Sequence, residues 1–153
     1  MILFHGSNVP IENIDLSKSR PFKDFGRAFY LSESERQALE MARFKTLTLW
    51  GKETITAFRV EDMTSLNMLH FDTYTEEWAE FVFNNRDESQ QFRHFYDVVY
   101  GPIANDTVGV QIRDLRERKI SFKKFLENLK YHKGITFQYA FCTERAISKL
   151  LKI

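Results

Sequence analysis

The strongest constraint on this chain lies at its N-terminus, where the apolar run Met1–Phe4 leads directly into His5-Gly6-Ser7. Such a run predicts a buried strand over Met1–His5, with a polar trio at its tip. Gly6 has no Cβ, so the backbone there can approach a ligand closely, and Ser7 can donate or accept a hydrogen bond. Polar residues held at the end of a scaffold element are common binding groups, although a histidine beside a turn glycine is more often structural.

The composition excludes several classes of protein. With 153 residues, 43% hydrophobic and 28% charged, the chain is expected to form a single domain over residues 1–153. Fifteen Phe residues bring the aromatic content to 15%, which predicts a core rich in rings. The net charge of +1 provides no global basic field to recruit nucleic acid, which leaves only a local basic patch for that purpose.

The number of cysteines and the length of the apolar runs indicate in which cellular compartment the protein is expected. The single cysteine, Cys142, excludes an internal disulfide and is compatible with a reducing compartment. No apolar run reaches the length that a membrane span needs, and the N-terminal run is too short and lacks the basic residues of a secretory signal. We therefore expect a cytoplasmic protein without membrane contact. An effector secreted without a cleaved signal would have the same features.

Short strand-like runs alternate with helical patterns along the chain. Strands are predicted between turn signals over residues 28–31, 53–60, 66–71, 97–101 and 135–141. Helices are predicted over 33–44 after a cap at Ser32 or Ser34, from the capping-box pattern 73–76 through Val82, over 108–118, from Ser121, and from Thr143 with Leu150 and Leu151 facing in. Residues 8–25 and 84–92 are predicted as loops. This mixture favours an α+β fold.

Several well-known kinds of active site lack their parts in this sequence. There is no Cys–His metal spacing, no His-Glu-x-x-His, no Gly-rich phosphate loop and no Gly-x-Ser-x-Gly elbow. A zinc enzyme, a P-loop nucleotidase and a serine hydrolase are therefore disfavoured, and we expect no metal. Outside the N-terminal trio, the histidines stand in no ligand-like pattern and are interpreted as surface or structural: His70, His94 and His132.

Three segments on predicted strands remain as carriers of chemistry: His5-Gly6-Ser7, Gly26–Ser32 and Phe137-Gln138-Tyr139. Their order resembles the ADP-ribosyltransferase superfamily, in its diphtheria-toxin and poly-ADP-ribose-polymerase-like branch. That branch carries His-Gly-Ser/Thr on its first strand, Gly-x-(Gly)-Phe/Ile-Tyr on the second and a Glu on a late strand. The resemblance implies a fold of split antiparallel β-sheets with flanking helices.

More narrowly, nearly the whole chain resembles a small bacterial toxin-like domain family of largely unknown function. Its members carry Phe/Tyr-His-Gly-Ser, Asp-Phe-Gly-x-x-Phe-Tyr and Gly-Pro-x-Ala-Asn-Asp. In this sequence the three motifs are Phe4–Ser7, Asp24–Tyr30 and Gly101–Asp106. In the last motif, Asn105 and Asp106 are expected to cap the next helix rather than to contact a target.

The superfamily resemblance implies that NAD is the substrate and assigns roles to residues at its motifs. His5 would hydrogen-bond a ribose hydroxyl, the Gly6 backbone would pair with the nicotinamide amide, and Tyr30 would stack on the nicotinamide ring. Secondary polar contacts would come from two serines: Ser7 and Ser32. Phe29 and Tyr30 alternate along one strand, so only one of the two is expected to face the site.

The loop before the second predicted strand is expected to contact the far half of NAD. Arg27, together with Arg20 or Lys23, would meet the pyrophosphate, because a guanidinium matches the geometry of phosphate oxygens. Asp24 would contact the adenosine ribose. These assignments rest on the resemblance and on the position of the loop.

Gln138 departs from the superfamily pattern, because it stands where a Glu is expected. A Glu would accept from the ribose 2′-hydroxyl and place a charge near the developing cation, whereas Gln can keep the hydrogen bond but not the charge. The change argues against poly-ADP-ribose chains and leaves mono-transfer open. Gln138→Glu is expected to preserve or raise NAD cleavage. Thr136 stands where the arginine-modifying branch has Glu, so arginine is not the indicated target.

We therefore expect a mono-ADP-ribosyltransferase that modifies a protein or nucleic-acid acceptor, as a bacterial toxin or defence effector. The resemblance also implies a small antitoxin-like protein partner. The alternative is a catalytically inactive module of the same fold that binds NAD or ADP-ribose. A nucleic-acid binder without NAD rests only on the basic segments 18–23 and 113–124, and the second also contains acids, as a solvated helix face does.

Overall fold

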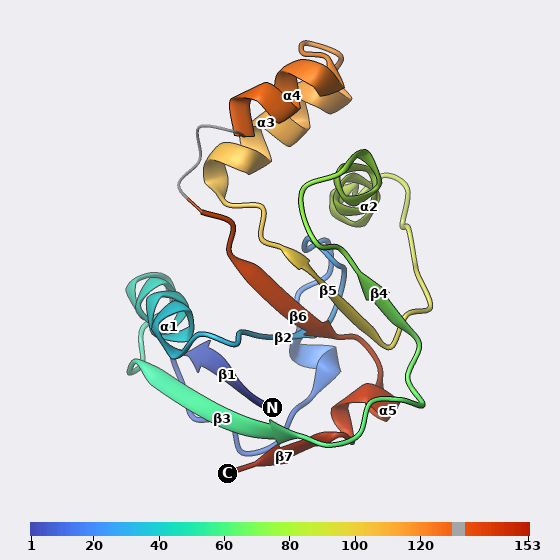
Figure 1. Ribbon diagram of the computed structural model, residues 1–153. Coiled ribbons are helices and arrows are strands. Elements are labelled where there is room, and N and C mark those ends of the chain that lie inside the picture. The colour runs from blue at the N-terminus through green and yellow to red at the C-terminus, as the bar shows by residue number, and fades with distance from the viewer. Residues whose placement is uncertain (130–133) are drawn as a thin grey trace.

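The computed structural model describes residues 1–129 and 134–153, and these form two sheets (Figure 1). The first sheet is antiparallel, with the order β1 (Ile2–Ser7), β3 (Thr54–Val60), β7 (Leu150–Lys152). The second has the order β2 (Phe29–Leu31), β6 (Phe137–Phe141), β5 (Val98–Pro102), β4 (Met68–His70). In the second sheet, β4 pairs with β5 in parallel and the other pairs are antiparallel. The predicted α+β class is confirmed.

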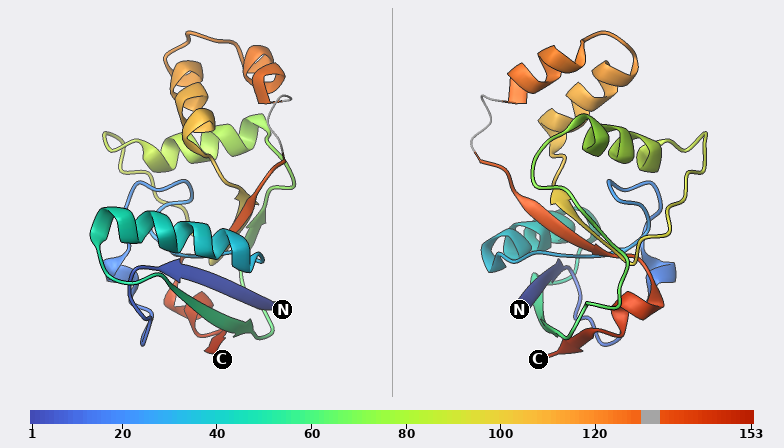
Figure 2. Two further views of the ribbon diagram at one scale, coloured as in Figure 1. Left: turned by 90° about the vertical axis from the view of Figure 1, so that its left-hand side faces the viewer. Right: turned by 45° about the vertical axis from the view of Figure 1, so that its right-hand side comes forward.

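The helices cover the sheets from different sides. Figure 2 shows α1 (Glu35–Leu49) lying across the first sheet. Three further helices gather at the other end of the molecule, beyond the second sheet: α2 (Glu76–Arg86), α3 (Asp106–Arg116) and α4 (Phe122–Leu129). A short helix, α5 (Glu144–Ile147), connects β6 to β7. In the described part of the chain, no helix is long and apolar enough to cross a membrane.

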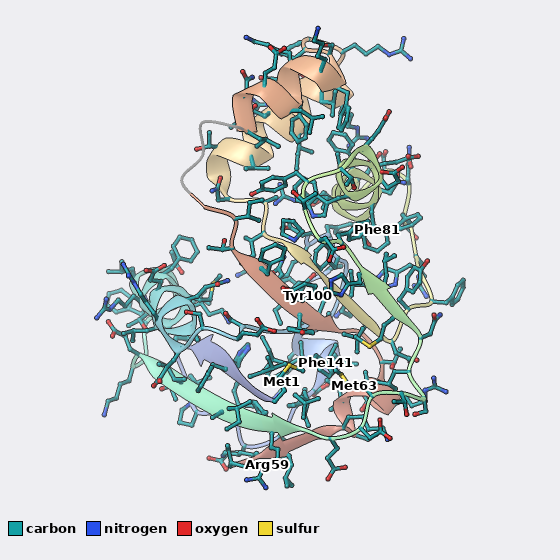
Figure 3. The ribbon with its side chains drawn as sticks, viewed as in Figure 1. Met1, Arg59, Met63, Phe81, Tyr100 and Phe141 are labelled. Carbon is teal, nitrogen blue, oxygen red and sulfur yellow. The ribbon has the colours of Figure 1, made fainter. Side chains whose placement is uncertain are left out.

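The second sheet is buried on both faces, because successive residues of its strands point to opposite sides. Val98 and Phe141 belong to a core shared with the first sheet, whereas Val99 and Ala140 belong to a core shared with α2, α3 and α4. Figure 3 shows these two cores: Phe141 lies in the lower one, and Phe81 lies on the side of α2. The second sheet therefore fixes the position of every element that surrounds it.

Local signals predicted the start of most elements. The first strand continues to Ser7, so the His-Gly-Ser trio is part of the β1 ladder rather than beyond its end. Ser34 caps α1, because its side chain accepts a hydrogen bond from the Gln37 N–H at 3.2 Å. Asn105 caps α3 in the same way, as expected from the sequence.

Four predictions about helices need correction. Helix α1 continues to Leu49, five residues beyond its predicted end. The cap of α2 is Thr75 rather than Thr73, and this helix continues to Arg86, into the segment predicted as a loop. The predicted C-terminal helix stops at Ile147, and Leu150–Lys152 instead form β7. The reason is tertiary, because β3 offers this segment a free ladder edge. The prediction for His132 lies outside the described residues.

Candidate functional site

The two sheets meet where β1 approaches β2. Phe4 and Ser32 exchange backbone hydrogen bonds there, with N–H···O distances of 2.8 and 2.9 Å. In a continued antiparallel ladder, the next hydrogen-bonded pair would be Gly6 and Tyr30, two residues along each strand. This pair does not form, and both carbonyls accept hydrogen bonds from side chains instead. The two strands thus open a gap that is bordered by backbone polar groups.

Two side chains occupy the acceptors at this gap. The Tyr30 carbonyl accepts a hydrogen bond from His5 Nδ1 at 2.7 Å. The Gly6 carbonyl accepts one from Lys45 Nζ on α1 at 2.9 Å. A ligand amide that entered the gap would find the same carbonyls that these side chains use.

A cavity of about 920 Å³ adjoins the gap. Its walls come from β1, the loop between β1 and β2, β2, α1, the end of α2, the segment after β5 and the start of β6. All the residues that the sequence assigned to the site line it except Arg27: His5, Gly6, Ser7, Arg20, Lys23, Asp24, Tyr30, Ser32 and Gln138. Small-molecule sites in proteins have volumes of roughly 300–1,000 Å³, so this cavity is large enough for a dinucleotide.

His5 is held in one protonation state and one orientation. The pKa of His5 is lowered to about 4, mainly by burial and then by the positive charge of Lys45. The hydrogen bond to the Tyr30 carbonyl raises the pKa, but by less than these two effects lower it. The ring is therefore neutral at pH 7. Since a carbonyl can only accept, Nδ1 carries the proton and Nε2 keeps a free lone pair. The ring also stacks on Phe29, with centroids 4.2 Å apart. His5 can thus accept a hydrogen bond from a ligand hydroxyl.

Five cationic side chains line the same cavity, and three of them form a group whose charges repel one another: Arg20, Lys23 and Lys45. Burial, together with the charges of Lys23 and Arg20, lowers the pKa of Lys45 to about 8. Burial and Arg20 also lower the pKa of Lys23. Among the described residues, the ion pairs involve none of these three side chains. The cavity is therefore electropositive and suits an anionic ligand.

Both aromatic residues of β2 line the cavity, which corrects the expectation that only one would do so. They point to opposite faces of the strand, but β1 and β2 separate here, so the cavity reaches both faces. Phe29 packs on His5, and the Tyr30 ring lies 5.1 Å from Lys23 Nζ. The Tyr30 hydroxyl donates to the Gly26 carbonyl at 2.7 Å, and burial raises the pKa of this phenol.

Gly6 is required for packing, which the sequence did not predict. A Cβ at this position would lie 1.8 Å from the Ala38 carbonyl oxygen of α1. The absence of a side chain therefore allows α1 to pack closely on β1. The backbone groups of Gly6 still face the gap, because they lie on the same side of β1 as those of Phe4.

Arg27 lies outside the cavity lining. Its guanidinium donates to the Ser17 and Ser19 carbonyls at 3.0 and 2.7 Å and so fixes the loop before β2. Ser7 and Ser32 line the cavity, but each hydroxyl also accepts a hydrogen bond from the backbone N–H two residues later. Arg20, Lys23 and Lys45 are therefore better placed than Arg27 to meet a phosphate.

Asp24 is engaged within the protein. Its Oδ1 accepts from Nε of Arg86 at 2.8 Å and from Nη2 of the same guanidinium. Its Oδ2 accepts from the Ala104 N–H at 3.1 Å and from Gln138 Nε2 at 3.4 Å. These donors use the lone pairs of both oxygens. Asp24 is thus part of the cavity wall rather than the free ribose ligand that the sequence suggested.

Lys45 and Arg86 also line the cavity, and no motif of the sequence pointed to either residue. A signal for Lys45 was present, because it follows Ala38 and Ala42 at helical spacing and so lies on the buried face of α1. Arg86 fell in a segment predicted as a loop. In the described ranges, no three His, Cys, Asp or Glu side chains gather in a way that could hold a metal ion.

Comparison with known proteins gives one match. Residues 1–152 fit the model of a family described as "Protein of unknown function (DUF3990)". No curated protein and no solved structure matches the chain. The match extends from β1 through β7, so all the walls of the cavity belong to the domain that defines this family.

Proposed function

The chain belongs to the DUF3990 family, and from its cavity we propose that it is a mono-ADP-ribosyltransferase that uses NAD. The observation that carries this proposal is His5, a neutral histidine with a free acceptor nitrogen at the mouth of an opened strand pair. The group of three cations in the same cavity supports an anionic dinucleotide as the ligand. The motif resemblance supports NAD in particular.

In this proposal, the nicotinamide amide enters the gap between β1 and β2 and takes the Gly6 carbonyl from Lys45. The freed ammonium then joins Lys23 in neutralising the pyrophosphate. His5 Nε2 accepts from a ribose hydroxyl. This arrangement uses the groups that the interrupted ladder leaves available at the gap.

The reaction breaks the bond between nicotinamide and C1′ of the ribose and passes through an oxocarbenium-like state. Gln138 contributes an amide oxygen that can accept from a ribose hydroxyl, but no charge. An acceptor nucleophile then bonds to C1′ and loses its proton. Without the carboxylate of the superfamily pattern, chemistry slower by about 10²-fold is expected.

The resemblance extends the proposal to the biological setting. We infer a bacterial toxin or defence effector that acts in the cytoplasm on a protein or nucleic-acid acceptor and is held by a small antitoxin-like protein. A second candidate is a module that binds NAD or ADP-ribose without cleaving it. The observation that favours this second candidate is the amide at position 138, which hydrogen-bonds Asp24.

The test uses the purified protein with NAD labelled in its adenylate half, together with a cell lysate. Transfer predicts label in the protein or the nucleic-acid fraction, lost in His5→Ala and Tyr30→Ala. His70→Ala is the matched control, because His70 is an exposed histidine on β4 that does not line the cavity. NAD binding without release of nicotinamide would support the binding module, and a protein that does not bind NAD would overturn both candidates.

A further inference from the structure

The carboxylate of Asp24 connects separate parts of the chain at the cavity wall. It accepts from Arg86 of α2, from the backbone of Ala104 after β5, and from Gln138 of β6. Arg86 also donates to the Ala104 carbonyl at 3.3 Å. Two sequence motifs that lie far apart in the chain, 24–30 and 101–106, are thereby joined beside the residue that replaces the expected Glu.

The hydrogen bond to Asp24 determines which way the Gln138 amide points. An ionised carboxylate only accepts, so the nitrogen end of the amide must face Asp24. The oxygen end then faces away from Asp24, and Gln138 lines the cavity. We propose that Asp24 is a positioning residue that turns the Gln138 oxygen toward the bound ribose, and that its charge restricts position 138 to an amide. This inference rests on the proposed function.

The proposal reverses the expectation for Gln138→Glu. A carboxylate at position 138 would take the place of an amide nitrogen that lies 3.4 Å from Asp24 Oδ2. Two carboxylates at that separation cannot both ionise freely, so the pair would retain a proton or move apart. Either outcome removes the acceptor from the ribose. Gln138→Glu alone should therefore be less active than the natural protein.

Exchanging the two side chains should restore the arrangement. In the double variant Asp24→Asn/Gln138→Glu, the amide at position 24 can donate to the carboxylate at position 138. The cluster keeps one carboxylate, so its total charge is unchanged. Asp24→Asn alone lacks this compensation, because its amide nitrogen would face the Gln138 amide nitrogen, and Gln138 could accept from it only by turning its oxygen toward position 24. Both variants that carry Asp24→Asn leave the Ala104 N–H without its carboxylate acceptor, so this loss is common to them.

The experiment compares the natural protein, the two single variants and the double variant. The kcat and KM for nicotinamide release are measured together with unfolding in urea. We expect each single variant to lose kcat by about 10²-fold with a smaller change in KM. We expect the double variant to return to within about tenfold of the natural kcat. A double variant no better than the singles, or a fully active Gln138→Glu, would overturn the inference.

A second measurement does not depend on catalysis. In Gln138→Glu, the paired carboxylates have a raised pKa in the folded state. The stability of this variant relative to the natural protein should therefore fall from about pH 5 to pH 8, and the double variant should show no such fall. A natural protein that binds NAD but releases no nicotinamide contradicts the transferase proposal alone. In that case, NAD affinity should be lost in each single variant and restored in the double variant. A natural protein that does not bind NAD would overturn the positioning role of Asp24 as well.

Discussion

Two buried aspartates in this molecule have almost the same surroundings. Asp24 and Asp97 are 8% and 7% exposed. Each accepts from a guanidinium, from one backbone N–H and from one further side chain. For Asp24 these donors are Arg86, Ala104 and Gln138, and for Asp97 they are Arg145, Asn67 and Thr143. The chemistry of the two clusters therefore does not separate a structural role from a functional one.

The two aspartates differ in their position relative to the cavity. Asp97 connects the end of β6 to α5, because Thr143 is both its partner and the cap of that helix, and it does not line the cavity. Asp24 lines the cavity, and one of its partners, Gln138, lines it too. Two buried carboxylates with similar hydrogen bonds can therefore differ in role: one connects two elements of the fold, and the other contacts a side chain that lines the cavity.

The largest expected effect distinguishes the two clusters directly. Asp24→Asn should lose about 3 kcal/mol of unfolding free energy, because it leaves the mostly buried Arg86 without its carboxylate. Asp97→Asn should lose about 2 kcal/mol, mainly through its buried hydrogen bonds, because the Arg145 side chain is 60% exposed and is solvated when unpaired. Only Asp24→Asn should also lose kcat for nicotinamide release, by about 10²-fold. Urea unfolding and steady-state kinetics on both variants check this. Equal loss of kcat in the two variants would remove the distinction between the clusters.

The pH dependence of the free energy of unfolding gives a separate test of the structural role of Asp97. Burial would raise the pKa of Asp97, but hydrogen bonds from Thr143, the Asn67 N–H and Arg145 lower it below its ordinary value. The native state therefore binds its proton at lower pH than the unfolded state does. The stability that Asp97 contributes is present above about pH 4 and is lost as the pH falls through its native pKa.

Urea unfolding of Asp97→Asn and the natural protein at a series of pH values measures this contribution. The gap in stability between the two proteins should be constant from pH 7 to about pH 5 and should narrow below that. A gap that widens on acidification would contradict the lowered pKa. Kinetic activity should not follow this titration, since Asp97 does not line the cavity.

The sequence alone predicted those parts of the fold that depend on local patterns. Strand β1, the caps Ser34 and Asn105, and the α+β class follow from short runs of residue types. Strand β7 did not follow, because its residues have a helical pattern and only pairing with β3 makes them extended. Long-range pairing of this kind leaves no mark in a short window of sequence.

The site shows the same division. Motif positions identified His5, Tyr30 and Gln138, which all line the cavity. The partner of Asp24 was not predictable, because Arg86 lies 62 residues away and reaches it only through the packing of α2. The packing requirement at Gly6 was not predicted either, since its close neighbour, Ala38, belongs to a helix that the sequence could not place on β1.

Lys45 differs from Arg86 and Arg145 in its surroundings, and this difference predicts a moderate pH dependence of NAD affinity. Each guanidinium faces a carboxylate, whereas Lys45 is held by the Gly6 carbonyl and has a pKa of about 8. As the pH rises through 8, Lys45 loses its charge, and an anionic ligand loses a partner. NAD affinity should weaken by about tenfold from pH 7 to pH 9.

Calorimetric titration of NAD at several pH values measures this dependence, and Lys45→Met is the comparison variant. It keeps the length and apolar stem of lysine, so its NAD affinity should be lower at pH 7 and nearly independent of pH up to 9. His5 should not add to the profile in this range, because its pKa is about 4. An unchanged pH dependence in Lys45→Met would assign the titration to another group.

The smallest expected effect concerns the loop that carries Asp24. The Tyr30 hydroxyl accepts from the Phe25 N–H at 3.1 Å and donates to the Gly26 carbonyl at 2.7 Å. Tyr30→Phe removes both bonds but keeps the ring beside Lys23. It should cost about 1 kcal/mol of stability and raise the KM for NAD only a few-fold, because the residues that follow Asp24 are held less firmly.

Tyr30→Ala, which also removes the ring, should bind NAD far more weakly. The difference between the two variants therefore measures what the ring contributes apart from the hydroxyl, when both are compared by KM and by urea unfolding. If Tyr30→Phe loses as much affinity as Tyr30→Ala, the hydroxyl and the loop position determine binding, and stacking on the ring does not. The cavity would then depend on the Asp24 loop more than on the aromatic residue of β2.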